Sequence, residues 1–415
     1  MYVRQTQRQE ITGEMLSTIF TKVLEKIPNH IAGIERQIQI GKAVEELTPH
    51  ERNFLHKKYN EFLFEMRRLN ASDIEMGGVT AKESIWFRVQ GSKNPRQDLG
   101  RWTLDQSDIL CHSLITRKQR ERLFNNRASD FSYSMRDGDT MTRYRASLYF
   151  DLGHMALNMR AIAAKVYSFK SLGFHENITK SFSLIHEKQG LVLVTGITGS
   201  GKSTTMDSIV DANNQIVDAH IVIIGDPIEF IHQSKKCIIR HREVGRDVLS
   251  FKEGAIQALR QDPDIIVVGE MRDPDTIMTC LEISDTGHKV FSTLHTGCAV
   301  ETIDRIVAEC PPIEQERVRM RLADQLRVVV SQKLIPDRQN KLVMAKEVLL
   351  VTTPVKAAIR NRNTQEIYQM ISEGGKLGMI TLEQDLVRLY RQGRISMESA
   401  VDFANNKKRI KELLS

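Results

Sequence analysis

At 415 residues the chain is too long for one small domain, and two or three domains are expected. A hydrophobic fraction of 41% is ordinary for a folded protein, and no stretch approaches the ~18 consecutive apolar residues that a membrane span requires. The net charge of +7 permits contact with acidic partners, but there is no basic tract with interleaved aromatic residues of the kind that reads single-stranded nucleic acid.

The first residues and the cysteines indicate the cellular location of the protein and the kinds of cysteine site that it can contain. Residues 1–8 lack the apolar core of a secretory signal peptide, so we expect a cytoplasmic location, with attachment to a membrane complex left open. No two of the five cysteines form a Cys-x-x-Cys pair, which argues against a zinc ribbon or a disulfide framework.

Residues 1–66 are predicted to form a helical N-terminal extension. Thr48-Pro49-His50-Glu51 is a capping box with proline at the first helical position. Apolar residues then recur at helical spacing, namely Leu55, Tyr59, Phe62, Leu63 and Met66. The extension is either a packing appendage or a docking segment for a partner.

Residues 67–165 are predicted to be a small α+β domain. A short strand is expected at 86–89 and a helix over 104–124, and the runs 144–150 and 156–162 are typical of a hairpin. A linker of about twenty residues, 166–185, is expected to follow.

Strands alternate with helices over residues 186–350, which predicts a mostly parallel sheet covered on both faces. The first strand, Leu191–Thr195, leads into the phosphate-binding pattern Gly-x4-Gly-Lys-Ser, in which a curled backbone directs N–H groups at phosphate oxygens. Lys202 would approach the β- and γ-phosphates, and the Ser203 hydroxyl would reach Mg²⁺. The candidate nucleotide-binding residues are Gly196, Thr198, Gly199, Ser200, Gly201, Lys202, Ser203 and Thr204.

Three further apolar runs of this region lead into polar side chains. They are Ile221–Ile224 before Asp226 and Glu229, Ile265–Val268 before Glu270, and Lys289–Leu294 before His295. Because open α/β sheets bind ligands at the carboxyl ends of their strands, these groups are candidates for one site. Taken singly, each could equally be a turn residue, a helix cap or a surface histidine.

Phosphoryl transfer requires groups of these types. Ser203 and one carboxylate can hold Mg²⁺, a second carboxylate can orient or deprotonate the attacking water, and a polar sensor can contact the γ-phosphate. Arginines from outside the core can neutralise transition-state charge, and Arg143, Arg145 and Arg160 are candidates. They could equally be solvated or paired arginines on exposed strands.

Residues 351–415 are predicted to be a helical C-terminal segment. Thr381 to Gln384 forms another helix-start box, and an apolar stripe follows it at Leu382, Leu386, Leu389 and Tyr390. Gly393 ends the stripe.

Over roughly residues 70–405 these motifs resemble those of the secretion-ATPase superfamily, specifically the PilT-type retraction motors of type IV pili. The segments that carry the resemblance are Ala71–Ile74, Asp226–Phe230, Asp262–Asp273, Thr286–His288 and Thr293–Thr296. The resemblance implies an α/β fold, with a RecA-like P-loop ATPase core, a PAS-like α+β N-terminal domain, and helical N- and C-terminal segments.

The resemblance also implies roles for individual residues. Glu229 would be the catalytic glutamate that activates water, and Glu270 would be the Walker B carboxylate acting through Mg²⁺. His295 would sense the γ-phosphate, His288 would support it, and Asp226 would belong to the nucleotide site. The expected cofactors are ATP and Mg²⁺. The expected partners are identical subunits in a homohexamer and an inner-membrane pilus platform protein, with no stable nucleic-acid partner.

Three departures from the family pattern leave alternatives open. Gly225 precedes Asp226 where the family usually has glutamate, the sequence after Ala358–Asn361 is more polar than usual, and residues 1–66 have no counterpart in the short members. The lack of a four-cysteine zinc site favours retraction over extension. An accessory or slow retraction ATPase, a DNA-uptake or translocating ATPase, and a type II or IV secretion ATPase remain the alternatives.

Overall fold

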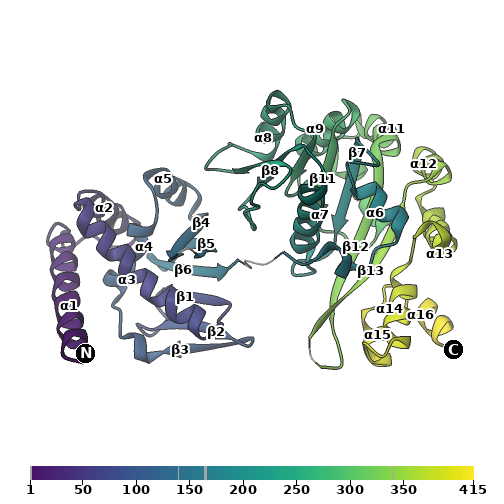
Figure 1. The fold of residues 1–415 in the computed structure, drawn as a ribbon. Helices are drawn as coiled ribbons and strands as arrows, with labels where there is room; N and C mark the ends of the chain where they lie inside the picture. The colour runs from purple at the N-terminus through teal and green to yellow at the C-terminus, as the bar shows by residue number, and fades with distance from the viewer. Residues whose placement is uncertain (1, 139, 163–165, 340) are drawn as a thin grey trace. The chain divides into compact units, whose positions relative to one another are not determined.

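In the computed structural model the chain divides into two compact units, Met1–Ala164 and Lys165–Ser415 (Figure 1). The structure describes residues 2–138, 140–162, 166–339 and 341–415. Each unit has its own sheet and its own hydrophobic core, as expected for separate domains.

The first unit contains a six-stranded antiparallel sheet in the order β3-β2-β1-β6-β5-β4. Its strands are β1 (Asp73–Gly77), β2 (Ile85–Val89), β3 (Ser92–Arg96), β4 (Ala128–Asp137), β5 (Thr140–Asp151) and β6 (His154–Ala161). Its helices are α1 (Tyr2–Leu24), α2 (Gly33–Glu45), α3 (Pro49–Arg68), α4 (Leu104–Leu114) and α5 (Arg117–Asn126).

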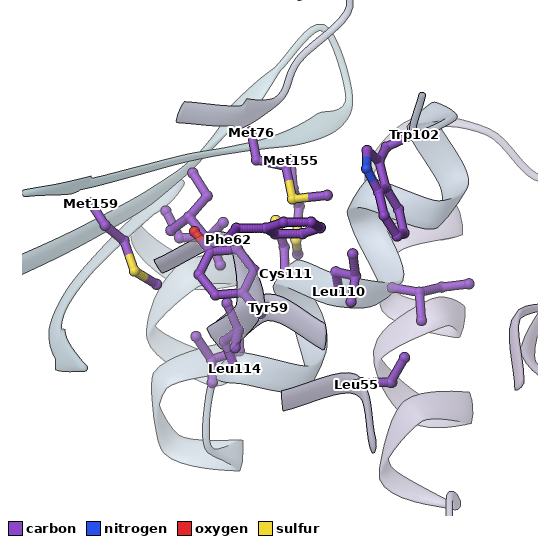
Figure 2. Packing of buried hydrophobic residues seen from close by; sticks show 14 of the residues in the cluster. Leu55, Tyr59, Phe62, Met76, Trp102, Leu110, Cys111, Leu114, Met155 and Met159 are labelled. Carbon is purple, nitrogen blue, oxygen red and sulfur yellow. The ribbon is translucent and has the colours of Figure 1, made fainter. Parts of the chain in front are cut away.

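The N-terminal helices share one core with this sheet. The predicted stripe of α3 is buried, and it belongs to the same cluster as Ile40 of α2, Phe87 of β2 and Cys111 of α4. Figure 2 shows part of this core, in which the Tyr59 and Phe62 rings lie among side chains from α4 and β6. Residues 1–66 therefore pack against the sheet as part of the first unit.

Capping residues explain where these helices begin. The predicted capping box is confirmed: Thr48 Oγ1 accepts from Glu51 N at 3.2 Å, and Glu51 Oε2 accepts from Thr48 N at 2.8 Å. The predicted strand at 86–89 and the hairpin of β5 and β6 are confirmed as well. The single helix expected over 104–124 is wrong, because Thr116 forms a new capping box with Gln119 and starts α5.

The second unit contains a seven-stranded sheet in the order β13-β12-β7-β11-β10-β8-β9. Its strands are β7 (Gly190–Thr195), β8 (His220–Gly225), β9 (Ile238–Glu243), β10 (Ile265–Val268), β11 (Lys289–Leu294), β12 (Leu326–Pro336) and β13 (Leu342–Leu350). Neighbouring strands are parallel throughout, except that β13 is antiparallel to β12. The predicted parallel sheet is thus confirmed.

Helices cover both faces of this sheet (Figure 1). Leu191 and Leu193 of β7 face a core formed with α8 (Phe251–Ala258), α9 (Pro274–Asp285), α10 (Ala299–Glu309) and α11 (Gln315–Gln325). Val192 and Val194 face the other core, formed with α6 (Glu176–Phe182) and α7 (Lys202–Ile216). Because alternate residues of a strand point to opposite faces, a fully buried apolar run is what this layered arrangement requires.

Residues 166–185, which the sequence predicts to be a linker, contain ordered structure that packs on the second unit. A short 3₁₀ turn (Phe169–Leu172) precedes α6, whose Ile178 and Phe182 are buried in the core with α7. Asn213 of α7 accepts from Leu184 N at 2.9 Å and donates to Phe182 O at 3.1 Å, so the end of α6 is tied to α7.

The C-terminal segment is helical, as predicted, and packs on β12 and β13. It comprises α12 (Thr353–Arg360), α13 (Ile367–Glu373), α14 (Leu382–Arg391), α15 (Met397–Phe403) and α16 (Lys407–Leu414). The capping box at Thr381 is confirmed, and Leu382, Leu386 and Leu389 are buried. Among the described residues, none of the helices combines the length and apolar character needed to cross a bilayer.

Candidate functional site

The phosphate-binding pattern forms the turn between β7 and α7. All of β7 is buried, and α7 starts at Lys202, directly after the loop. Gly196 has φ +147, and a Cβ there would clash with Ser200 Oγ and with the backbone oxygen of Gln332. The loop therefore needs glycine at this position so that the chain can curl under the start of α7.

Lys202 lies over this loop and close to two carboxylates. Its Nζ donates to Gly196 O at 2.9 Å and to Ile197 O at 3.2 Å. Burial lowers the pKa of Lys202, and the negative charges of Glu270 and Glu229 oppose that shift. The structure thus brings together three predicted site residues from three different strand ends.

The residues of the loop suit a phosphate group. Thr198 and Gly199 are exposed, whereas Ser200 is buried and its Oγ has no hydrogen-bond partner among the described protein atoms. Ser203 and Thr204 occupy the first turn of α7, where unpaired N–H groups and the helix dipole favour an anion. The orphaned hydroxyl and the helix start are consistent with bound nucleotide phosphates.

Gln332 supports the loop from β12, and no local sequence pattern predicts this contact. Its Nε2 donates to Ser200 O at 2.7 Å, and its Oε1 accepts from Thr205 Oγ1 at 3.0 Å. Gln332 is itself buried. A glutamine 132 residues along the chain from its partner carries no local signal, so only the pairing of β12 with β7 reveals this contact.

Glu270 and His295 are paired at the carboxyl ends of two adjacent strands. β10 and β11 are parallel neighbours, and His295 Nε2 lies 3.1 Å from Glu270 Oε1. Arg272 Nη2 lies 2.7 Å from Glu270 Oε2, and this hydrogen bond raises the pKa of Arg272. Arg305 of α10 donates to His295 O at 2.8 Å.

These side chains border a pocket of about 370 Å³. Its lining is completed by Met271, Ile277, Leu294 and Glu309. Arg272 and Arg305 add positive charge beside the Glu270–His295 pair, so the pocket has both the carboxylate that a metal requires and the cations that a phosphate requires.

The Glu229 loop, residues 226–237, connects β8 to β9. Contacts hold it on both sides of Glu229, whose side chain is exposed. Ile228 N donates to Glu243 Oε2 at 3.2 Å, and Glu243 is buried at the end of β9. His232 Nε2 lies 3.0 Å from Asp207 Oδ1 of α7. The loop is therefore fixed both to the neighbouring strand and to the helix that follows the phosphate loop.

Asp207, His232 and Glu243 lie beside the site, although no sequence motif marks them. Burial raises the pKa of Asp207, and the negative charge of nearby Glu229 adds to that shift. The charge of Asp226 contributes in the same way to the raised pKa of Arg272, which places Asp226 near the Glu270 end of the site.

Gly225, which ends β8 and precedes Asp226, is closely surrounded. A Cβ there would lie 2.9 Å from Ile228 Cδ1 and 3.1 Å from Pro227 O. A side chain at this position therefore requires Ile228 to move. Gly225 pairs with Glu243 in the β8–β9 ladder, so a buried carboxylate lies on the adjacent strand.

His288 lies at the other end of β11 from His295. It precedes the strand and lies 3.1 Å from Thr286 Oγ1, measured at Nδ1. The 6 residues of β11 lie between the two histidines and separate them by about 20 Å. The structure does not bring His288 to the phosphate loop or to His295.

Arg143 and Arg160 belong to the first unit. Arg160 Nε lies 2.8 Å from Asp73 Oδ1, across the β1–β6 pair. Arg143 lies on β5 opposite Ser134 and is buried. Arg160 thus has a carboxylate partner within its own sheet, and a role for either arginine in neutralising phosphate charge stays a prediction.

Comparison with known proteins gives matches over most of the chain. It is 41% identical over 295 residues to the "Type IV pilus retractation ATPase PilT" of Pseudomonas aeruginosa, which covers 71% of this chain and 84% of that protein. It is 32% identical over 303 residues to the "Type IV pilus ATPase PilU" of the same organism, covering 73% and 78%. A solved structure described as the pilus retraction motor PilT with bound ADP superimposes with a TM-score of 0.75 at 38% identity, over 85% of this chain and 98% of that one.

The family model described as "Type II/IV secretion system protein" matches residues 49–411. This range includes the phosphate loop, the Glu229 loop, and the Glu270–His295 pair. The α/β fold predicted from the sequence is that of the matched structure. The chain therefore belongs to the type II/IV secretion system protein family.

Proposed function

We propose that this chain is an ATPase that drives retraction of a type IV pilus. The observation that carries the proposal is the position of Lys202, at the start of α7 and within the field of both Glu229 and Glu270. The relatives named as pilus ATPases, at 41% and 32% identity, support the choice of system.

The mechanism assigns each step to a residue of the site. Lys202 and the first turn of α7 bind the β- and γ-phosphates of ATP. Ser203 and Glu270 would hold Mg²⁺, which neutralises phosphate charge when bound. Glu229 accepts a proton from the attacking water, as a general base at the end of a loop held by Glu243 and Asp207.

His295 is proposed to report the state of the γ-phosphate. In the structure its Nε2 lies beside Glu270, and Arg305 fixes its backbone oxygen. A γ-phosphate would offer Nε2 a second acceptor, so hydrolysis would change the partner of His295. Arg143 and Arg160 are retained as proposed sources of transition-state charge.

The working assembly is proposed to be a homohexameric ring on the cytoplasmic face of the inner membrane, acting on a pilus platform protein. ATP turnover by the purified chain tests the chemistry, with Lys202→Ala as the inactive variant and Lys252→Ala, an exposed lysine paired with Asp275, as the matched control. Wild-type turnover in Lys202→Ala would contradict the phosphate-loop assignment. Non-motile cells with excess pili in a deletion strain would establish retraction, and cells without pili would contradict it.

An accessory retraction ATPase is a second candidate, favoured by Gly225 and by the likeness to PilU. Since a side chain at Gly225 would displace Ile228, a Gly225→Glu variant that stays inactive would not discriminate. The better test compares hydrolysis by the wild-type chain alone with hydrolysis in the presence of a separate retraction motor. Turnover by the chain alone would rule out a purely accessory role.

The alternative of a DNA-uptake ATPase is tested by measuring whether DNA raises ATP turnover. Stimulation by DNA that declines as salt rises would favour a nucleic-acid translocase. Constant turnover with and without DNA would favour the pilus motor.

A further inference from the structure

One cavity of the first unit lies among the ends of four helices. Its volume is about 640 Å³, and it is bordered by the last residues of α2 and α4 and the first turns of α3 and α5. This volume is within the range of about 300–1,000 Å³ that small-molecule sites occupy. Nothing in the ATPase chemistry uses it.

The charges around the cavity do not balance. Arg52, Arg117 and Arg120 border it, with Glu45 as the carboxylate in its lining. Arg120 is buried and pairs with Glu45, so its charge is compensated. Arg117 lies 3.3 Å from Glu121, but both side chains are largely exposed, and such a pair contributes little.

Arg52 has no such compensation. Its guanidinium forms no hydrogen bond or ion pair within the described parts of the chain. Burial lowers the pKa of Arg120, Glu45 opposes this, and the positive charge of Arg52 adds to the lowering. The exposed Arg52 guanidinium therefore lies within electrostatic reach of Arg120 beside an open cavity, where it can attract an anion.

The floor of the cavity is fixed by a buried chain of hydrogen bonds. Arg120 Nε donates to His112 Nδ1 at 3.2 Å, and Arg120 Nη2 donates to His112 O at 2.9 Å. His112 Nε2 lies 3.3 Å from Gln37 Oε1, and Gln37 donates to Asp108 at 2.5 Å. Asp108 in turn accepts from Met155 N at 2.8 Å. Arg120 is thus held in place on one side of the cavity, because it cannot turn away without breaking this chain.

We propose that this cavity binds a small soluble phosphate ester of nucleotide size. Arg52 supplies an unpaired positive charge and Arg117 a second one, which is held only by its exposed pair with Glu121, and together they match the charge of about −1.5 to −2 on a phosphate monoester. Their planar donor groups suit phosphate oxygens. Val44, Leu114 and Ile115 form an apolar wall against which the organic part of the ligand would pack. The proposal is independent of the ATPase function.

Calorimetry on the full chain tests it, carried out in a Lys202→Ala background that disables the phosphate loop, so that the second site is observed alone. The probes are inorganic phosphate and GMP. Arg52→Gln should weaken GMP binding about tenfold or more, and Arg52→Lys should weaken it less, since lysine keeps the charge but loses the forked donor. Arg68→Gln on the same helix, where the exposed arginine pairs with Glu65, is the matched control and should bind as wild type.

Three results would overturn the proposal. They are the lack of GMP binding at about 1 mM, corresponding to about −4 kcal/mol; equal binding by wild type and Arg52→Gln; and binding only to phosphatidylglycerol vesicles. Thermal unfolding of the Arg52→Gln and Arg68→Gln variants checks that both fold, so that lost binding cannot be attributed to lost structure.

Discussion

The two units place their polar residues by different rules. In the second unit, parallel strands end at one edge of the sheet, so Lys202, Glu229, Glu270 and His295 come together from distant parts of the sequence. In the first unit the sheet is antiparallel, and its buried polar network lies between helices, around Asp108 and His112. The comparison suggests that the second unit carries the phosphate chemistry, whereas the buried polar residues of the first mainly fix its fold.

The largest effect is expected from the carboxylates of the second unit. Glu229→Gln should lower ATP turnover by about 10²–10⁴-fold, because the proposed general base is lost, while ATP binding is kept. Steady-state turnover and nucleotide binding are measured on the same preparation. Glu366→Gln, an exposed glutamate of the second unit, serves as the control. Near-wild-type turnover in Glu229→Gln would show that another residue acts as the general base.

The next largest effect should fall on the stability of the first unit. Asp108→Ala leaves Met155 N and Gln37 without their acceptor, at a cost of about 1–3 kcal/mol for each buried donor. Denaturant unfolding should show a lower midpoint, and Asp105→Ala, which removes a partly exposed pair with Arg36, should cost less. An unchanged midpoint in Asp108→Ala would show that the network does not stabilise the unit.

Loss of the Gln332 side chain that supports the phosphate loop should have a smaller effect, namely a lower affinity for ATP. Gln332→Leu removes the donor to Ser200 O and the acceptor for Thr205 Oγ1, so the loop loses a fixed position. We expect ATP affinity to fall about tenfold, equivalent to about 1.4 kcal/mol. Gln339→Leu, on the turn after β12, is the control. Equal ATP affinity in both variants would show that Gln332 does not contribute to nucleotide binding.

The smallest effect should depend on pH. Glu347 of β13 is buried and accepts from Ala299 N at 2.8 Å, and burial raises its pKa from 4.5 to about 7. The folded state therefore holds this proton more tightly than the unfolded state, so the stability that this group contributes is complete below about pH 4.5 and is lost as pH rises to about 7.

Relative to the wild type, Glu347→Gln should therefore have a higher free energy of unfolding above pH 7 than at pH 5, by on the order of 1 kcal/mol. The reason is that the amide carries no charge that burial would disfavour. Thermal unfolding at both pH values, compared with the exposed control Glu366→Gln, measures the difference. A variant that is equally destabilised at both pH values would show that Glu347 acts only as a hydrogen-bond acceptor.

Much of the candidate site could be predicted because its signals are local. The glycine pattern before Lys202 specifies a turn that starts a helix, and each apolar run that ends in Glu229, Glu270 or His295 specifies a buried strand with a polar end. Capping boxes at Thr48 and Thr381 likewise mark helix starts within four residues.

Contacts between distant segments were decided by tertiary structure alone. Gln332 reaches the phosphate loop only because β12 pairs with β7, and Glu243 reaches Ile228 only because β9 pairs with β8. The motif around His288 suggested a place in the site, yet β11 carries it to the far edge of the sheet. Local sequence determines φ, ψ and the face on which a side chain lies, whereas the partner it meets depends on which strands become neighbours when the whole sheet buries its apolar surface.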